Sequence, residues 1–376
     1  MNMDATHWKW ISNQDDFAAL CTHLHSVPVI GIDTEFIRTR TFYARLGLLQ
    51  LSDHTDTWLV DPLQISDWAC LGSLLQAEQP VKIIHSGSED MEILHRIAPV
   101  AMAGFFDTQI AAALCGIGPA LSYQALVGEV LGVAIDKGET RSNWLQRPLS
   151  ESQMKYAALD VSYLPELHQK LSSELQNKGR QAWCLEDSAR MARPISEQNA
   201  VAQQYDRFKM VWRLKPDQRA GLMAALTWRE ATARRKDIPR NRIMDNDGIL
   251  AIARTLPGDL DALQSLNVMS RRFLQKDGPV ILEGLQQALA SEDRPPKKPP
   301  PLDRDAKPLM ERLRGRVRQR AEDLGLAPET LAGKREITAL ISGGSLPEKL
   351  QGWRRAVVGQ SLLDDLNGDA MGQPAS

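Results

Sequence analysis

The run of residues 29–36 places two acids at alternate positions of a segment whose apolar residues predict a buried strand. Side chains alternate across a strand, so Asp33 and Glu35 should project from the same face. A second pair, Tyr156 and Asp160, lies four residues apart in a helical pattern, where such residues are neighbours one turn apart. A fold that uses both pairs must bring an early strand and a late helix together.

A third acidic element follows the apolar strand expected at residues 81–84 and precedes a helical run that ends at residue 97. Ser86, with Glu89 three residues later, predicts a capping box that would start this helix. Asp90 would then lie in the first turn, at a strand end where open α/β sheets collect ligands. We therefore expect a fourth acid beside the two pairs.

Four converging acids require compensation. Two carboxylates about 4 Å apart repel by roughly 4 kcal/mol at an effective dielectric constant of 20. Hard divalent cations with oxygen ligands remove this penalty, and Mg²⁺ or Mn²⁺ suits an all-carboxylate site. A zinc or iron–sulfur centre is poorly supported, because the cysteines are scattered without paired spacing. They are Cys21, Cys70, Cys115 and Cys184.

By itself, each motif has an ordinary structural interpretation: a solvated strand edge, a helix cap with dipole-favoured acids, or a packed tyrosine beside a surface acid. All three in one chain, on elements that could meet, favour a metal-binding site. Two roles remain open for His85: contact with the site, or packing at the end of the strand. Asp107 is expected to cap the helix that runs to Leu114, and not to act as a fifth ligand.

The three motifs together resemble those of a known family. The motifs Asp-x-Glu, His-x-Gly-x-Glu-Asp and Tyr-x-x-x-Asp, in this order, resemble those of the DEDD exonuclease superfamily in its tyrosine-bearing branch. The flanking residues 33–51 and 141–149 are similar to bacterial ribonuclease D. The resemblance covers residues 7–175 and continues more weakly to the C-terminus, and no catalytic position departs from the pattern.

The resemblance implies a ribonuclease-H-like α/β exonuclease domain, with a mixed sheet and flanking helices, that hydrolyses its substrate with two divalent cations (Mg²⁺ or Mn²⁺). It implies that Asp33 bridges both ions, that Glu35 and Asp160 hold the ion bearing the water, and that Asp90 helps to hold the second. Tyr156 would orient the attacking hydroxide, because an unperturbed tyrosine pKa near 10 makes it a poor base.

The expected elements agree with a mixed sheet. Strands are predicted at residues 7–11, 29–35, 46–52, 57–60 and 81–84, and helices at 14–25, 67–76 and 91–97. The strands at 46–52 and 57–60 are close enough in sequence to pair antiparallel. Ser150 and Gln153 predict a capping box for the helix that bears Tyr156 and Asp160.

Helical spacing dominates the remainder. Residues 226–230, 237–243 and 252–257 resemble the helicase-and-RNase-D C-terminal (HRDC) domain, and a second, degenerate HRDC-like unit is expected near the C-terminus. The Pro/Lys-rich residues 293–301 predict a stiff, solvated linker. The expected division is an exonuclease domain at 1–175, a helical connector at 176–204, two all-α HRDC-type domains at 205–292 and 303–370, and a linker at 293–302 between them.

The net charge of −2 conceals an asymmetry. Residues 1–170 carry about 20 acids against 11 bases, whereas residues 207–242 carry about 11 bases against 3 acids, which suggests an anionic polymer as substrate. A basic cluster is predicted to contact phosphates, although a solvated charged face is the alternative. It comprises Arg234, Arg235, Lys236, Arg240 and Arg242. A second set, Arg38, Arg40 and Arg45, is expected to guide the 3′ strand, with His85 as a further candidate RNA contact.

The favoured function is a 3′–5′ exoribonuclease that trims the 3′ ends of tRNA precursors and other small structured RNAs and releases nucleoside 5′-monophosphates. A DNA-directed 3′–5′ exonuclease would use the same acids, and a non-catalytic RNA-binding protein is a third option. The sequence contains no long apolar run and no signal-peptide pattern, so we expect a cytoplasmic enzyme without a membrane partner. No obligate protein partner is inferred.

Overall fold

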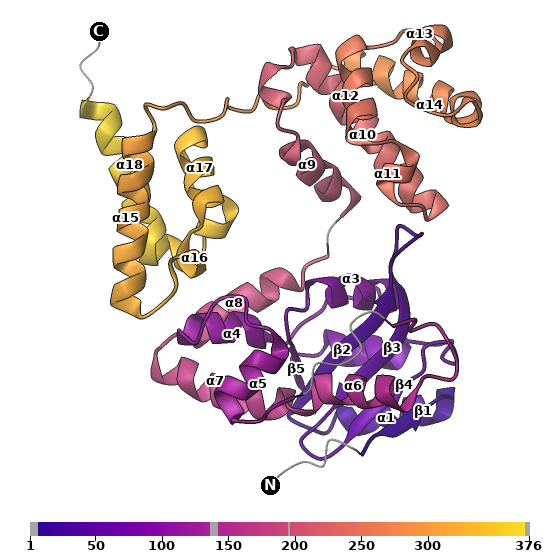
Figure 1. Ribbon diagram of the computed structural model, residues 1–376, viewed down its shortest axis with the longest axis vertical. Coiled ribbons are helices and arrows are strands. Elements are labelled where there is room, and N and C mark those ends of the chain that lie inside the picture. The colour runs from indigo at the N-terminus through magenta and orange to yellow at the C-terminus, as the bar shows by residue number, and fades with distance from the viewer. Residues whose placement is uncertain (1–6, 136–141, 195, 373–376) are drawn as a thin grey trace. The chain divides into compact units, whose positions relative to one another are not determined.

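The computed structural model describes residues 7–135, 142–194 and 196–372 (Figure 1). Contacts divide the chain into two compact units. Unit 1 comprises Met1–Ile37, Leu46–Pro194 and Leu302–Ser376, and unit 2 comprises Arg38–Arg45 and Ile195–Pro301. Arg141, the first residue of the second stretch that resembles ribonuclease D, lies outside the described residues.

Among the described residues of unit 1, one mixed sheet has the strand order β1-β4-β3-β2-β5-β6. Strands β3 and β4 pair antiparallel, whereas β1 with β4, β2 with β5, and β5 with β6 pair parallel. The expected mixed sheet and the antiparallel pairing are confirmed, but the three-residue β6 was not predicted, because so short a strand has no visible alternation. The strands are β1 (Lys9–Ile11), β2 (Val29–Ile37), β3 (Arg45–Ser52), β4 (Thr57–Val60), β5 (Val81–Ile84) and β6 (Phe105–Asp107).

The sheet is buried on both faces. Ile30, Ile32, Leu49 and Leu51 belong to one core cluster, which includes buried residues of α1 (Gln14–Leu24), α2 (Ala69–Gln76) and α3 (Ser88–Ile97). Leu48 faces the other way, into a cluster that contains buried residues of α6 (Glu151–Ser162). Further helices of unit 1 are α4 (Thr108–Cys115), α5 (Tyr123–Leu131), α7 (Leu164–Asn177) and α8 (Gln181–Met191). Successive side chains of β3 thus face opposite clusters, and Leu48 points toward the cluster that contains α6.

Two of the three predicted helix caps are confirmed. The Ser150 capping box starts α6, and the Asp107 carboxylate accepts from two backbone N–H groups at the start of α4. The prediction of a Ser86 capping box was wrong. Ser86 has a left-handed φ of 58°, and α3 begins after Gly87 without a side-chain cap. At this turn the Gly87 N–H donates to Asp107 at 3.0 Å, so a residue from a neighbouring strand takes up the backbone group.

The C-terminal helices share a core with the α/β part of unit 1. Leu313 and Leu340 belong to the same buried cluster as Leu114 and Leu171. The rings of Trp183 and Trp353 are stacked, with centroids 4.4 Å apart. The elements involved are α15 (Lys307–Leu324), α16 (Pro328–Leu331), α17 (Lys334–Gly343), η2 (Glu348–Leu350), η3 (Arg355–Gly359) and α18 (Gln360–Gly372).

Unit 2 is helical, as expected, and its predicted core is buried. Leu222, Leu226, Ile249, Ile252 and Leu263 are each fully buried in one cluster. The elements are α9 (Glu197–Arg207), η1 (Val211–Arg213), α10 (Pro216–Lys236), α11 (Arg240–Ile243), α12 (Asn246–Thr255), α13 (Leu260–Ser265) and α14 (Arg271–Ala290).

The start of the Pro-rich linker is held against unit 2, in contrast to the freely solvated spacer expected from its composition. The Tyr205 hydroxyl donates to the Pro296 carbonyl at 2.8 Å, and the Arg219 guanidinium donates to the Pro295 carbonyl at 2.9 Å. Lys298 forms an ion pair with Asp206 at 2.7 Å. Proline has no N–H, but its carbonyl still accepts hydrogen bonds. Composition alone does not reveal whether a donor lies close enough to use it.

The division by contacts differs from the linear division expected from the sequence. The boundary between the units falls at Pro194, inside the expected connector at 176–204, and the C-terminal helices group with unit 1. The five-segment division remains a prediction about independently folding parts. Within the described ranges, no helix is both long and apolar enough to cross a membrane.

Candidate active site

Three of the predicted acids meet in unit 1. Asp33 and Glu35 project from the same face of β2, and Asp160 comes from α6. Each offers a carboxylate oxygen, and these oxygens all lie within 4.8 Å of one another. The fourth acid, Asp90, lies in the first turn of α3, is 8% exposed, and accepts a hydrogen bond from the Thr34 hydroxyl. Acids from two of the three motifs therefore meet, and Asp90 of the third is close enough for its charge to raise the pKa of Asp33.

Close approach of α6 to β2 makes this arrangement possible. A Cβ at Gly31 would lie 2.4 Å from the Ser52 hydroxyl and 3.1 Å from the Val161 carbonyl, so a side chain would push α6 away. The Ser52 hydroxyl donates to that same carbonyl at 2.7 Å. The small side chains Ala157 and Ala158, both fully buried, also allow close contact. Asp160, one residue before Val161, is thereby held beside the β2 acids.

Burial raises the pKa of every acid in the cluster, and repulsion from neighbouring acids adds to this for Asp33 and Glu35. Desolvation is the largest cause throughout, and it raises the pKa of Glu35 to about 9, that of Asp160 to about 7 and that of Asp90 to about 6. The pKa of Asp33 lies well above its usual range, because burial is reinforced by the charges of Asp90, Asp160 and Glu35. Without a counter-charge, part of the cluster would hold protons at neutral pH, so the site favours a bound cation.

Tyr156 lies one helical turn before Asp160, as predicted. Its hydroxyl donates to the Asp160 carboxylate, and this bond lowers the pKa of Asp160 against the opposing effect of burial. Burial, followed by the charges of Asp160 and Glu35, raises the pKa of the Tyr156 phenol. The phenol therefore remains protonated, so it can donate a hydrogen bond but cannot act as a general base.

Sequence reasoning assigned no role to Gln50 or Thr34. Gln50 on β3 is fully buried, and its amide donates to Asp33 at 3.5 Å. Thr34 supplies the hydroxyl that contacts Asp90. A glutamine between fully apolar residues of a buried strand was a visible signal for Gln50. Thr34 gave none, because threonine is ordinary in a strand.

His85 is packed at the end of β5, which is the second of the two roles considered for it. One ring nitrogen lies 2.9 Å from the Thr108 hydroxyl and the other 3.0 Å from the Leu121 carbonyl. The ring also makes an edge contact with Tyr123. Burial lowers the pKa of His85, which favours the neutral ring. These contacts do not support the suggested role in binding RNA.

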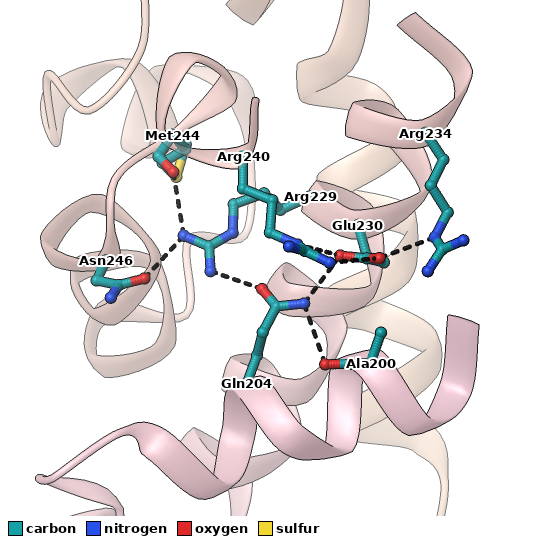
Figure 2. Close-up of polar contacts among 8 residues, drawn as sticks. All are labelled: Ala200, Gln204, Arg229, Glu230, Arg234, Arg240, Met244 and Asn246. Atoms are coloured by element: carbon teal, nitrogen blue, oxygen red, sulfur yellow. Dashed lines mark hydrogen bonds and ion pairs between the residues drawn. The ribbon is translucent and has the colours of Figure 1, made fainter. Parts of the chain in front are cut away.

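Most of the predicted phosphate-binding cluster is used in ion pairs within unit 2 (Figure 2). Glu230 is fully buried and is paired with Arg234 at 2.8 Å and with Arg240. Lys236 is paired with buried Asp277 at 2.8 Å. These three cations already have carboxylate partners, and their contact with phosphates remains a prediction. The missed signal was Glu230 itself, four residues before Arg234 on α10.

Two cations of the basic cluster remain exposed. Arg242 is exposed, and the Arg235 side chain is 60% exposed although it lies 3.5 Å from Asp277. Figure 2 also shows Gln204 contacting Arg229 and Glu230, at 2.8 and 2.9 Å. This network ties α9 to α10 in unit 2.

The other predicted arginines lie on or beside the segment that connects β2 and β3. Arg38, Arg40 and Arg45 are exposed, and their segment Arg38–Arg45 belongs to unit 2. Phe42 in this segment lies under the Arg240 guanidinium, 4.7 Å from ring centroid to guanidinium carbon. The role of these arginines in guiding RNA remains a prediction.

A mixed sheet that carries an acid pair on one strand, a third acid and a tyrosine on a packed helix, and a fourth acid at a helix start defines a 3′–5′ exonuclease of the DEDD type. The family model described as 3′–5′ exonuclease matches residues 8–176, and the model described as HRDC domain matches residues 220–285.

Among curated proteins, ribonuclease D of Pseudomonas paraeruginosa is 37% identical over 97% of this chain and 99% of its own length. Ribonuclease D of Escherichia coli is 32% identical over 95% of this chain and 97% of its own length. The crystal structure of E. coli RNase D, described as an exoribonuclease involved in structured RNA processing, superposes with a TM-score of 0.84 at 30% identity, covering 96% of this chain and 99% of that one.

The chain belongs to the ribonuclease D family of 3′–5′ exoribonucleases. The resemblance seen in the three motifs and the expected fold class are thereby confirmed. The DEDD exonucleases depend on divalent metal ions, in agreement with the acidic cluster. The HRDC match falls within unit 2. The relation of the C-terminal helices to this domain remains a prediction.

Proposed function

We propose that this chain shortens tRNA precursors and other small structured RNAs from their 3′ ends and releases nucleoside 5′-monophosphates. The observation that carries the proposal is the meeting of Asp33, Glu35 and Asp160 within 4.8 Å, in a chain of this family. The E. coli relative's description as an enzyme of structured RNA processing supports this substrate class. Such a role would place the chain in the cytoplasm.

The acids fit Mg²⁺ or Mn²⁺. Their donors are all carboxylate oxygens, the hard ligands that these ions prefer, and their raised pKa values reflect a repulsion that a divalent ion relieves. We assign Asp33, Glu35 and Asp160 to one ion and Asp33 with Asp90 to a second. Two such ions would supply an activated water and stabilise the departing 3′ oxygen.

The remaining residues of the site would orient the reacting groups. The Tyr156 phenol has one O–H, which would turn from Asp160 to the attacking oxygen once a cation holds that carboxylate, and the phenol would stay protonated. The Thr34 hydroxyl would hold Asp90 in place from the opposite face of β2. Each is a neutral donor next to an acid, so it restrains the carboxylate without adding charge to the site.

We assign RNA contact outside the acid cluster to the exposed cations. Arg235 and Arg242 of unit 2, with Arg38, Arg40 and Arg45, would bind phosphates regardless of base sequence. Arg234, Lys236 and Arg240 are reassigned to holding unit 2 together, since their charges are already paired.

The test is incubation of a 3′-extended tRNA precursor, labelled at its 5′ end, with Mg²⁺, Mn²⁺ or EDTA. We expect shortening by single nucleotides from the 3′ end with either metal and none with EDTA. A DNA strand of the same sequence, assayed in parallel, tests the DNA-directed alternative. Faster shortening of DNA than of RNA, or shortening that persists in EDTA, would contradict the proposal.

A further inference from the structure

Gln50 is a fully buried amide in a stretch of β3 that is otherwise apolar. Leu49 and Leu51 are buried on one face of the strand, and Leu48 is buried on the face that Gln50 shares. Burying a primary amide costs free energy unless its polar atoms find partners. A leucine would fill this place better if packing were the only requirement.

The amide is directed at the acid cluster. Its Nε2 donates to Oδ2 of Asp33 at 3.5 Å, and its Oε1 is buried with no hydrogen-bond partner among the described residues. When Asp33 is ionised, as a cation ligand would be, the opposite orientation would set two oxygens against each other, so the nitrogen faces Asp33. Gln50 therefore does not serve a hydrogen-bond network elsewhere in unit 1.

Asp33 is the acid that most needs such a donor. It is surrounded by Glu35, Asp90 and Asp160, and a backbone hydrogen bond at Thr34 is its other favourable contact. Repulsion from three neighbours would rotate an unrestrained carboxylate away from the position that a cation needs. Neutral donors behind a ligand fix its orientation without competing for the ion.

We propose that Gln50 is a positioning residue for the cation site: its amide holds the Asp33 carboxylate directed toward Glu35 and Asp160. This inference rests on the proposed function, since it requires Asp33 to bind the cation. The same side of β3 carries Ser52, whose hydroxyl donates to the Val161 carbonyl at 2.7 Å and does not contact the acids. Ser52 thus provides a control for the packing of β3 against α6.

The experiment measures Mn²⁺ binding to the full-length protein without RNA, by isothermal titration calorimetry. Gln50→Leu and the nearly isosteric Gln50→Met should each weaken Mn²⁺ binding about 10-fold to 100-fold. Ser52→Ala should lower the melting temperature, and it should weaken Mn²⁺ binding less than Gln50→Met does, because it loosens the contact with α6 and removes no donor to an acid. Asp33→Asn should lose binding at this site, and it serves as the reference for the metal assignment itself.

The outcomes separate the two ideas. Wild-type Mn²⁺ affinity in Gln50→Met, with binding lost in Asp33→Asn, would overturn the inference and leave the proposed function standing. Equal losses of affinity in Gln50→Met and Ser52→Ala would also overturn it, because that pattern indicates general distortion of β3. Wild-type affinity in Asp33→Asn would instead remove the metal assignment. If Gln50→Leu does not fold, Gln50→Met decides.

Discussion

The Arg354 guanidinium holds the Asp187 carboxylate through two contacts of 2.8 Å, although the two residues are 167 positions apart in the chain. Arg354 is 6% exposed and also donates to the Thr330 carbonyl at 3.0 Å. The pair joins the C-terminal helices to α8 inside unit 1. It explains, together with the shared core, why these helices group with the exonuclease part.

Loss of this pair should destabilise the protein. Arg354→Ala would leave a largely buried carboxylate with only Arg190, 3.4 Å away, so we expect a loss of about 3 kcal/mol in the free energy of unfolding. The neighbouring exposed Arg355 is the matched control, and Arg355→Ala should stay within about 0.5 kcal/mol of wild type. Urea unfolding measures both. Equal effects of the two substitutions would refute the role of the pair.

Asp33→Asn should abolish turnover while RNA binding survives. The substitution keeps the shape of a side chain that three acids surround, but removes the charge that a bridging cation needs. RNA affinity measured by filter binding should change less than about threefold, because phosphate contacts supply most of it. Asp15→Asn, at an exposed acid of α1, controls for the change of charge. Near-normal shortening of RNA by Asp33→Asn would exclude the site.

The metal-free protein should lose stability as pH rises. Folded Glu35 keeps its proton up to about pH 9, whereas the unfolded chain loses it near 4.5, so the folded state holds more protons between these values. The free energy of unfolding therefore falls as pH rises through this window. Asp160 and Asp90 act likewise below about pH 7 and about pH 6.

Mg²⁺ should oppose this loss, because it binds the ionised carboxylates. At 100-fold excess over its Kd it adds about 2.7 kcal/mol, and the gain should be larger at pH 8.5 than at pH 5.5. Melting temperatures with Mg²⁺ and with EDTA at the two pH values measure the effect. Glu35→Gln should reduce the pH dependence in EDTA. An Mg²⁺ shift that is larger at pH 5.5 would speak against a carboxylate site.

Tyr156→Phe should lower kcat more than it weakens substrate affinity. The phenol stays protonated and would turn its one O–H to the reacting oxygen, so its loss would remove that orientation. A fall in kcat on the order of 100-fold is expected, as for other oriented donors at active sites, with KM changed little. Tyr163→Phe, just past the end of α6, is the control. A wild-type kcat, or a rise in KM alone, would assign Tyr156 to binding.

Arg240 and Arg242 should behave differently although they are two residues apart. Arg240→Ala breaks a pair with buried Glu230 and should cost about 1–3 kcal/mol of stability, with little change in the salt dependence of RNA binding. Arg242→Ala should leave stability unchanged and reduce the slope of log Kd against log salt by about 1. Thermal unfolding and binding at several salt concentrations distinguish them. A reversed pattern would restore Arg240 as a phosphate contact.

Periodicity alone determined the local parts of the site. Asp33 and Glu35 share a face because strand side chains alternate, and Tyr156 contacts Asp160 because they are one helical turn apart. The Ser150 and Asp107 caps were equally predictable, since each involves atoms within three residues. These relationships depend on backbone geometry over a few residues, which the sequence specifies directly.

The tertiary structure decided whatever depends on distant partners. It brought α6 against Gly31, directed Gln50 at Asp33, paired Arg240 with Glu230, and gave the Gly87 N–H to Asp107 where a Ser86 cap was expected. Each of these contacts joins different elements, so its existence depends on how those elements pack and on which buried charge is nearest. The type of a residue and the pattern of its neighbours in sequence do not reveal which distant residues it will contact.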